Sequence, residues 1–253
     1  MNNNYRKVYA YKGIEVSERG AIRRAYDNKG SILGIPTYHN LSFKTDKHGD
    51  KIVYTKDYGE IRVDRLVCLA YRGNPKGGQK FIIHNDKDKT HCWKDNLRWA
   101  STYEYGEFYK DDPIINTPDG FRMIDDHHVY VSKAGEIKID GKKVTLLDYL
   151  YDPDLDKHRA TDLSFNCPYT NAYGATKKHR VNVDDCVAEA FIPKPNNMIN
   201  PVVIHKNCDY KDCNVSNLEW VERTDTKYAD YLKKRQIAID VRNCELEKEF
   251  SGH

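Results

Sequence analysis

The chain has 253 residues, and its 41 Lys and Arg residues against 38 Asp and Glu residues give a formal net charge of +3. At roughly 100–200 residues per domain, this length allows one large domain or two domains of about 110 residues. Its 19 Tyr, 7 Phe and 3 Trp residues exceed what a disordered composition carries, so the chain is expected to fold. A charge of +3 does not by itself make an electrostatic clamp for DNA, so any nucleic-acid partner has to be argued from local patches.

No apolar run approaches the roughly 18–20 residues that a membrane-spanning helix needs. The first residues, Met1-Asn2-Asn3-Asn4, also lack the charged and apolar regions of a signal peptide, so we expect neither a secreted nor a membrane protein. The seven cysteines are an odd number, and no two of them are separated by two residues. Without an export signal they are expected to be reduced thiols, several of them buried.

The first elements predicted along the chain are short strands. Val16 lies in an apolar strand pattern that runs into Gly20, and a second short strand follows, which is typical of a β-hairpin. Two more strands, at residues 41–44 and 51–54, flank the turn residues His48-Gly49-Asp50.

A helix is predicted after these strands. Asp64 stands where a helix N-cap belongs, ahead of apolar residues spaced three and four apart at Leu66, Leu69 and Ala70. The segment Gly73-Asn74-Pro75 is expected to end this helix, because proline disfavours helical geometry in the residue before it.

A ββα unit is predicted next. A short apolar strand at residues 81–83 ends at His84, and a polar loop leads to Asn96-Leu97-x-Trp99 and a last helix. The order is therefore strand, histidine, loop, strand and helix.

The second half of the chain repeats this order, which predicts an internal duplication. Residues 16–23 recur at 131–138 with an offset of 115, and residues 63–71 recur at 183–191 with an offset of 120. At an offset of 121, three further residues recur: His84, Asn96 and Trp99 as His205, Asn217 and Trp220. Three blocks in the same order with a slowly drifting offset indicate two copies of one unit, with small insertions in loops.

We therefore predict an α+β protein with two tandem copies of a small β-rich module followed by a ββα unit. The expected domains are residues 1–110 and 123–226, joined by a linker at 111–122 that contains Asp, Pro and Gly. A C-terminal helix and tail are expected at 227–253, with a helical pattern from Thr226 to Phe250.

Residues 81–105 and 202–226 resemble the HNH (ββα-metal) endonucleases of phage homing elements. The distance from His84 to Asn96 is 12 residues, the same as from His205 to Asn217, and this spacing is also found in that family. The Val-Ser-x-x-Gly-x-Ile-Arg blocks resemble the small nuclease-associated module at the N-termini of such proteins. The resemblance covers most of residues 10–105 and 125–226, and it implies a DNA partner and a location in the cytoplasm of an infected bacterial host.

The resemblance also implies catalytic positions. In such nucleases the histidine is a general base that deprotonates water for attack on the phosphodiester, and one divalent metal stabilises the leaving oxygen. His84 and His205 match the general-base position, while Asn96 and Asn217 match the Asn that orients the base or its loop. An active nuclease of this kind would need Mg²⁺, and otherwise no cofactor is predicted.

The metal-ligand positions of the family do not match in either copy. Ile83 and Ile204 precede the histidines, and an alkyl side chain cannot bind a hard cation. Tyr105 and Thr226 stand 21 residues after the histidines, where the family has Asn or His. Three carboxylates lie close enough in sequence to be substitute ligands: Asp86, Glu104 and Asp225. The alternative is that both histidines are structural residues, hydrogen-bonded across the ββα loop.

Two cysteines near the second histidine are candidate zinc ligands. Cys208 and Cys213 lie in the loop after His205, which resembles the Cys-containing loop of another HNH subgroup. A structural zinc site needs four ligands, and only three are visible here. Buried structural thiols are the favoured interpretation.

Clusters of cations point to nucleic acid as the partner. The six candidate contact residues are Arg19, Arg23 and Arg24 in the first hairpin and Lys177, Lys178 and Arg180 before the second helix. Each phosphate contact would add to a salt-dependent affinity. The alternative is a solvated surface, because acidic runs such as Asp111-Asp112 alternate with the basic ones.

The sequence thus predicts a nucleic-acid-binding protein, with double-stranded DNA as the partner, that derives from a phage HNH homing endonuclease and has lost cleavage. Two alternatives stay open. The first is an active metal-dependent HNH endonuclease or nickase. The second is a virion structural protein, or an inhibitor that binds a host protein, built on the same scaffold.

Overall fold

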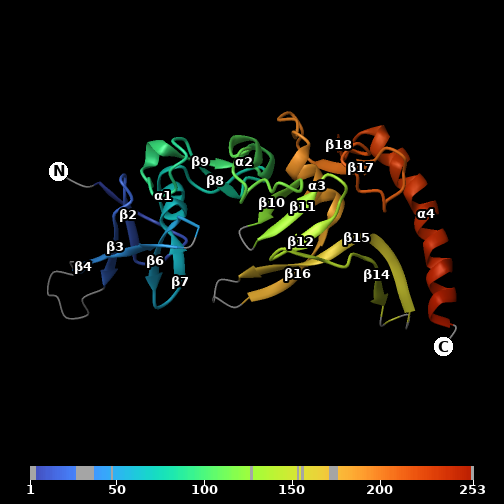
Figure 1. Ribbon diagram of the computed structural model, residues 1–253, viewed down its shortest axis with the longest axis horizontal. Helices are drawn as coiled ribbons and strands as arrows, with labels where there is room; N and C mark the ends of the chain where they lie inside the picture. The colour runs from blue at the N-terminus through green and yellow to red at the C-terminus, as the bar shows by residue number, and fades with distance from the viewer. Residues whose placement is uncertain are drawn as a thin grey trace. The chain divides into compact units, whose positions relative to one another are not determined.

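The computed structural model describes residues 4–26, 37–46, 48–125, 128–152, 154, 157–170 and 176–251. The chain divides into two compact units, the first reaching Phe108 and the second beginning at Tyr109 (Figure 1). Both units contain helices and small antiparallel sheets, which confirms the predicted α+β class. No helix in the described ranges is long and apolar enough to cross a membrane.

The first unit opens with a four-stranded antiparallel sheet in the order β1-β2-β3-β4. Its strands are β1 (Tyr5–Lys7), β2 (Ile14–Ser17), β3 (Ile22–Tyr26) and β4 (Thr37–Leu41). The predicted hairpin is confirmed, with Val16 opposite Ile22. Gly20 lies in its turn at φ +81°, and a Cβ there would lie 2.8 Å from the carbonyl oxygen of Cys92, so the turn requires glycine.

A three-stranded sheet follows and leads into the first helix. It contains β5 (Phe43–Thr45), β6 (Lys51–Thr55) and β7 (Gly59–Arg62). The single strand predicted at 41–44 is wrong, because β4 ends at Leu41 and β5, in another sheet, begins at Phe43. The strand predicted at 51–54 is confirmed. In the turn before it, the Asp46 carboxylate accepts the N–H groups of His48 (2.8 Å) and Asp50 (2.9 Å).

Helix α1 (Val63–Tyr71) begins two residues earlier than a cap at Asp64 would place it, so that prediction is wrong. The N-cap residue is Arg62, which has no side-chain cap, and Asp64 lies inside the first turn. The Asp64 carboxylate instead contacts the side chains of Arg62 and His84. The helix is held by its apolar face, where Leu66 and Val67 are fully buried.

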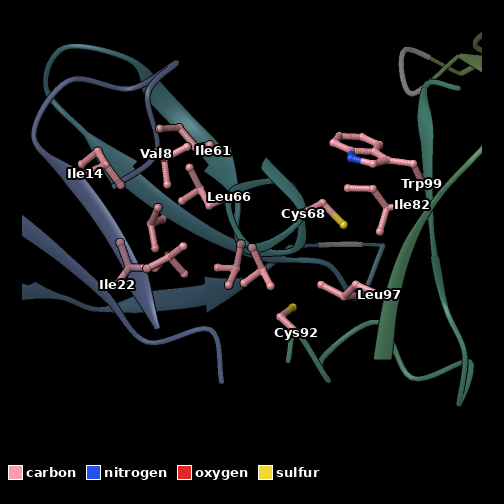
Figure 2. Close-up of a cluster of buried hydrophobic side chains, with 14 residues drawn as sticks. Val8, Ile14, Ile22, Ile61, Leu66, Cys68, Ile82, Cys92, Leu97 and Trp99 are labelled. Atoms are coloured by element: carbon pink, nitrogen blue, oxygen red, sulfur yellow. The ribbon is translucent and has the colours of Figure 1, made fainter. Parts of the chain in front are cut away.

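The ββα unit of the first half consists of β8 (Phe81–His84), β9 (Leu97–Ala100) and α2 (Thr102–Phe108), with a short 3-10 turn η1 (Lys94–Asn96) before β9. His84 pairs with Leu97 in the two-stranded sheet. One buried cluster joins the N-terminal sheet, α1 and this unit, with Ile22, Leu66 and Leu97 among its members (Figure 2).

The second unit has the same order of elements, with longer strands in its second sheet. Its first sheet has β10 (Phe121–Asp125), β11 (Val129–Ser132), β12 (Ile137–Ile139) and β13 (Lys142–Lys143). Its second sheet has β14 (Leu147–Asp152), β15 (Lys157–Thr170) and β16 (Thr176–Asn182). Helix α3 (Val183–Phe191) follows, and then β17 (Pro201–His205), β18 (Leu218–Glu222) and α4 (Thr226–Ser251).

Asp184, at the position that corresponds to Asp64, likewise lies in the first turn of α3, whose N-cap residue is Asn182. The C-terminal helix predicted from Thr226 to Phe250 is confirmed. It is attached to the second unit by its buried Tyr231 and Leu246.

The segment expected as a linker, residues 111–122, packs with the second unit. Ile115 is fully buried, and Asn116 forms a β-bridge with Arg122. The Arg122 guanidinium also donates to the carbonyl oxygen of Ala190 at the end of α3 (2.6 Å). These contacts tie the segment to the β10 strand and to α3.

Candidate functional site

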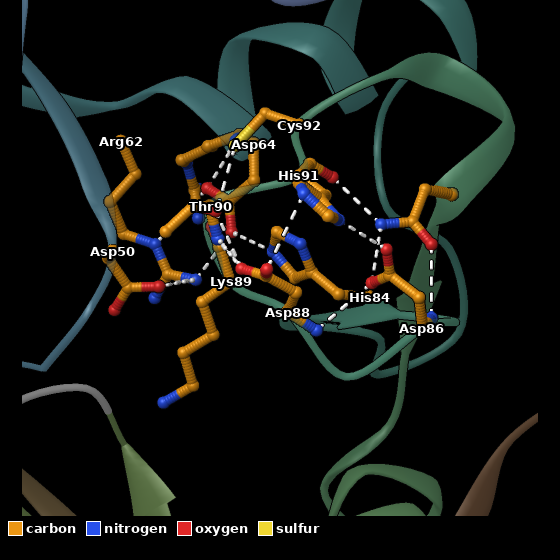
Figure 3. A network of polar contacts seen from close by, with 12 residues as sticks. Asp50, Arg62, Asp64, His84, Asp86, Asp88, Lys89, Thr90, His91 and Cys92 are labelled. Carbon is orange, nitrogen blue, oxygen red and sulfur yellow. Dashed lines mark hydrogen bonds and ion pairs between the residues drawn. The ribbon is translucent and has the colours of Figure 1, made fainter.

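His84, the predicted general base of the first unit, is held inside the protein. Its side chain is 1% exposed, and its Nε2 lies 3.2 Å from Oδ2 of Asp64 in the first turn of α1. Arg62 contacts the same carboxylate, with Nη2 2.5 Å from Oδ2 and Nε 3.2 Å from Oδ1. Figure 3 shows these groups converging from β7, α1 and β8.

The partners of Asp64 keep its carboxyl group in the charged form. Burial alone would raise the pKa of Asp64, but the Arg62 guanidinium and the hydrogen bond from His84 lower it well below the usual range. Asp64 is therefore ionised at neutral pH. Arg62 also lies 3.4 Å from Asp50, whose own pKa is raised, chiefly by burial. The resulting row, Asp50–Arg62–Asp64–His84, joins the second sheet to α1 and to the ββα unit.

Asn96, the second predicted catalytic residue, closes the loop after His84. Its Nδ2 donates to Oδ1 of Asp86 (2.9 Å) and to the carbonyl oxygen of His91 (2.8 Å), and its Oδ1 accepts the N–H of Asp86 (3.1 Å). His91 Nδ1 lies 2.6 Å from the Asp86 carboxylate. Burial alone would raise the pKa of Asp86, but the bonds from His91 and Asn96 hold it at about 2. Asn96 thus fixes the shape of the loop.

The second unit repeats the loop network residue for residue. Asn217 donates to Oδ1 of Asn207 (3.0 Å) and to the carbonyl oxygen of Asp212 (2.7 Å), and it accepts the N–H of Asn207 (3.0 Å). Each of these residues lies 121 positions after its counterpart in the first unit.

The surroundings of His205 differ from those of His84. His205 is also 1% exposed, but its Nδ1 lies 3.1 Å from the hydroxyl of Tyr231 in α4, and its Nε2 lies 3.8 Å from Sγ of Cys213. Burial lowers the pKa of His205, so the ring is neutral at pH 7. Burial likewise raises the pKa of Cys213 well above that of an ordinary thiol.

The buried carboxylate of the second unit lacks the arginine found in the first. Asn182 stands in the place of Arg62, just before α3. Burial, followed by the nearby carboxylates of Asp185 and Asp162, raises the pKa of Asp184 to about 7. The same buried position is therefore a charged ion-pair partner in one unit and a carboxyl group that is partly protonated at neutral pH in the other.

The residues in the ligand positions do not fit a magnesium site. Ile83 is fully buried in β8. Ile204 is 3% exposed and lies in an apolar cluster with Val221 and Tyr231. Tyr105, at the helix position, stacks on Phe81 with ring centroids 4.5 Å apart. Within the ranges that the structure describes, no three His, Cys, Asp or Glu side chains gather so as to hold a metal ion.

The three substitute carboxylates have other roles. Asp86 is engaged by His91 and Asn96, as described above. Glu104 accepts the N–H of Ser101 (2.8 Å) at the start of α2, and Asp225 accepts the N–H of Lys227 (2.9 Å) at the start of α4. Both are bonds of the helix-terminus type.

No disulfide links the seven cysteines, all of which lie in described segments.

The arginines of the first hairpin lie among aromatic rings. The Arg23 guanidinium donates to Glu15 (2.6 and 2.8 Å) and lies between the rings of Tyr5 (4.0 Å) and Tyr38 (3.8 Å). Arg24 forms an ion pair with Asp57 and lies 5.3 Å from the centre of the Tyr26 ring. Arg19 is exposed.

In the second unit, Arg180 and Lys178 lie in different surroundings. Arg180 donates to Oγ of Ser164 (2.6 Å) and to the carbonyl oxygen of Tyr149 (3.1 Å), which ties β16 to β15 and β14. Lys178 is exposed on β16, and the side chain of Lys177 lies outside the described residues. Of the five candidate cations whose side chains the structure describes, Arg19 and Lys178 are exposed, Arg23 and Arg24 form ion pairs, and Arg180 joins three strands.

Sequence reasoning missed the partners of the two histidines. The local pattern predicts a helix cap at Asp64, and nothing in it marks Arg62 or Tyr231 as a partner of a histidine. One signal in the sequence could have indicated such a partner: an aspartate recurs at the same place in both helices, as Asp64 and Asp184.

No family model matches this chain, and no curated protein matches its sequence. A solved structure described as DNA binding and cleavage by the HNH homing endonuclease I-HmuI is similar to part of it, with 21% sequence identity and a TM-score of 0.29. The similarity covers 46% of this chain and 59% of the endonuclease chain. A function for this chain therefore has to come from its own residues.

Proposed function

We propose that this protein binds double-stranded DNA through two HNH-like units and does not cleave it. The observation that carries the second part is the state of the two histidines. Each is 1% exposed and bonded inside the fold, to Asp64 in one unit and to Tyr231 in the other. A general base must reach its water and the scissile phosphate, and neither ring reaches solvent.

Binding is supported by cations on the surfaces of both units. Arg19 and Lys178 are exposed, and the α4 helix carries Lys227 and Lys233 with side chains 51% and 80% exposed. Such groups neutralise phosphates and release counterions from the duplex. Exposed tyrosine rings beside Arg23 and Arg24 add a surface of mixed cationic and aromatic character.

A common origin of the two units is part of this proposal. It is supported by the matching hydrogen bonds of Asn96 and Asn217. It is also supported by the hairpin glycines Gly20 and Gly135, which have φ of +81° and +85° and whose added Cβ would meet Cys92 and Cys213. A phage-type origin, and a location in the cytoplasm of an infected bacterium, follow from the resemblance of the motifs.

The test combines a binding assay with a cleavage assay. Duplex DNA should be retarded in a gel shift, and the affinity should fall by at least about tenfold between about 50 and about 200 mM salt. Supercoiled plasmid incubated with the same protein and Mg²⁺ or Mn²⁺ should stay unnicked. Nicking that is lost in the double variant His84→Ala, His205→Ala would establish the nickase instead. If no DNA binds at low salt, the proposal is wrong, and the alternative of a virion structural protein or an inhibitor of a host protein takes its place.

A further inference from the structure

A cavity of about 950 Å³ opens beside the N-terminal sheet of the first unit. Five tyrosines line it: Tyr9, Tyr11, Tyr26, Tyr38 and Tyr58. They come from the β1–β2 turn, from β3 and β4, and from the turn before β7. None of the residues of the His84 network lines this cavity, so the cavity is separate from that network.

The tyrosines divide into a fixed wall and an exposed rim. Tyr11 and Tyr58 meet edge to face with centroids 5.2 Å apart, and the Tyr58 hydroxyl accepts the N–H of Lys12 (2.9 Å). Tyr9, Tyr26 and Tyr38 are 96%, 44% and 41% exposed. A tyrosine normally buries much of its ring on folding, so three exposed rings around one cavity indicate a surface for an aromatic ligand.

The charge of the cavity wall is positive. Its two carboxylates face arginines: Glu15 pairs with Arg23, and Asp57 pairs with Arg24. Lys7 and Lys12 add two exposed ammonium groups next to Tyr9. Aromatic faces with adjacent cations are the elements that bind single-stranded nucleic acid, where bases stack and phosphates are neutralised.

We infer that this cavity binds an unpaired nucleotide of a nucleic-acid strand, with the base stacked on the rim tyrosines and a neighbouring phosphate beside Lys7 and Lys12. Its volume falls at the upper end of the roughly 300–1,000 Å³ of pockets for small organic groups, which leaves room for one or two nucleotides. The inference rests on the proposed function in taking nucleic acid as the partner. It adds that an unpaired base is bound at a place separate from the two ββα units.

The experiment measures binding of a 2-aminopurine-containing oligothymidylate by fluorescence anisotropy and by quenching of the base, with the full-length protein. Tyr9→Ala should weaken binding by about fivefold or more and reduce the quenching, since stacking on one aromatic ring is worth about 1–3 kcal/mol per base. Tyr9→Phe should keep both. Tyr54→Ala is the matched control, because Tyr54 is 67% exposed on β6 and does not line the cavity. Lys12→Ala should weaken binding and flatten its salt dependence.

Two further probes separate the outcomes. Blunt duplex DNA tests the proposed function by itself: duplex binding without Tyr9-dependent binding of the single strand overturns this inference and leaves the proposed function intact. Tyr9-dependent binding of the single strand without duplex binding supports the inference and overturns the choice of double-stranded DNA. Deoxyadenosine monophosphate that binds as tightly as the oligonucleotide would instead assign a free-nucleotide site. If neither Tyr9→Ala nor Lys12→Ala changes the affinity, the inference is wrong.

Discussion

At the scale of residues, one histidine position has two different environments. His84 faces an ionised aspartate that is itself held by Arg62, whereas His205 faces a phenol and a thiol. Both rings are buried, and a polar group buried with its partner contributes to stability while one buried alone is costly. The histidines therefore act in these units as internal connections between β8 or β17 and a helix.

Replacing His84 with Ala should lower the free energy of unfolding of the first unit by about 1–3 kcal/mol, because Asp64 loses a buried partner. Differential scanning calorimetry of the full chain measures the shift. His91→Ala is the control, since the His91 side chain is 42% exposed and its contact with Asp86 lies at the surface. An unchanged melting temperature for His84→Ala would contradict a structural histidine and return it to the candidates for catalysis.

Asp184 should make the second unit less stable as the pH rises. Its folded pKa is about 7, against 3.8 for the ordinary carboxyl group, so between about pH 4 and pH 7 the folded state holds a proton that the unfolded state has lost. The free energy of unfolding therefore falls as the pH rises through this window, on the order of a few kcal/mol in all. Asp184→Asn keeps the shape of the protonated group and removes the charge.

The variant Asp184→Asn should thus be more stable than the wild type at pH 8, with a difference that shrinks toward pH 4. Thermal unfolding of both proteins at a series of pH values gives the comparison. Equal pH dependence in the two proteins would contradict a protonated Asp184.

At the scale of elements, the hairpin turn at Gly20 is fixed by its contact with the ββα loop. The added Cβ of an alanine would lie 2.8 Å from a backbone oxygen, that of Cys92, which cannot move without moving the loop that Asn96 closes. Gly20→Ala should therefore lower the free energy of unfolding by more than the roughly 1–2 kcal/mol expected for an alanine in the left-handed conformation alone.

Gly49→Ala is the matched control, because Gly49 has φ +83° and, chain neighbours aside, no atom of the described residues lies within 4 Å of the added Cβ. Gly49→Ala should lower the free energy of unfolding only by the roughly 1–2 kcal/mol of the left-handed conformation. Urea unfolding of the two variants measures the difference, and equal losses would show that the contact with Cys92 is unimportant.

At the scale of the whole molecule, two units each contain their own buried cluster, and each presents its own cations. Avidity between two weak sites on one chain can raise the overall affinity without new contacts. The cations of the first unit are expected to differ in role, since Arg19 is exposed whereas Arg23 is held by Glu15 and two tyrosine rings.

Arg19→Ala should flatten the salt dependence of duplex binding by about one unit of slope, as expected for the loss of one phosphate contact, and leave the melting temperature unchanged. Arg23→Ala should lower the melting temperature of the first unit, because Glu15 is then buried without its guanidinium. Gel shifts at several salt concentrations and calorimetry on both variants measure these effects. A salt slope that Arg19→Ala does not change would remove Arg19 from the DNA-binding surface.

The sequence by itself determined the α+β class, the order of helix, strand, histidine, loop, strand and helix in each half, and the C-terminal helix, because hydrophobic periodicity and glycine or proline at turns are local signals. It also placed two histidines at equal spacing from two asparagines and showed that isoleucine precedes each histidine. The tertiary structure alone decided what those histidines touch. Asp64 lies 20 residues before His84, and Tyr231 lies 26 residues after His205 on a different element. The five cavity tyrosines come from two strands and two turns and meet only when these pack together, and such burial and pairing depend on contacts between distant segments that no local pattern encodes.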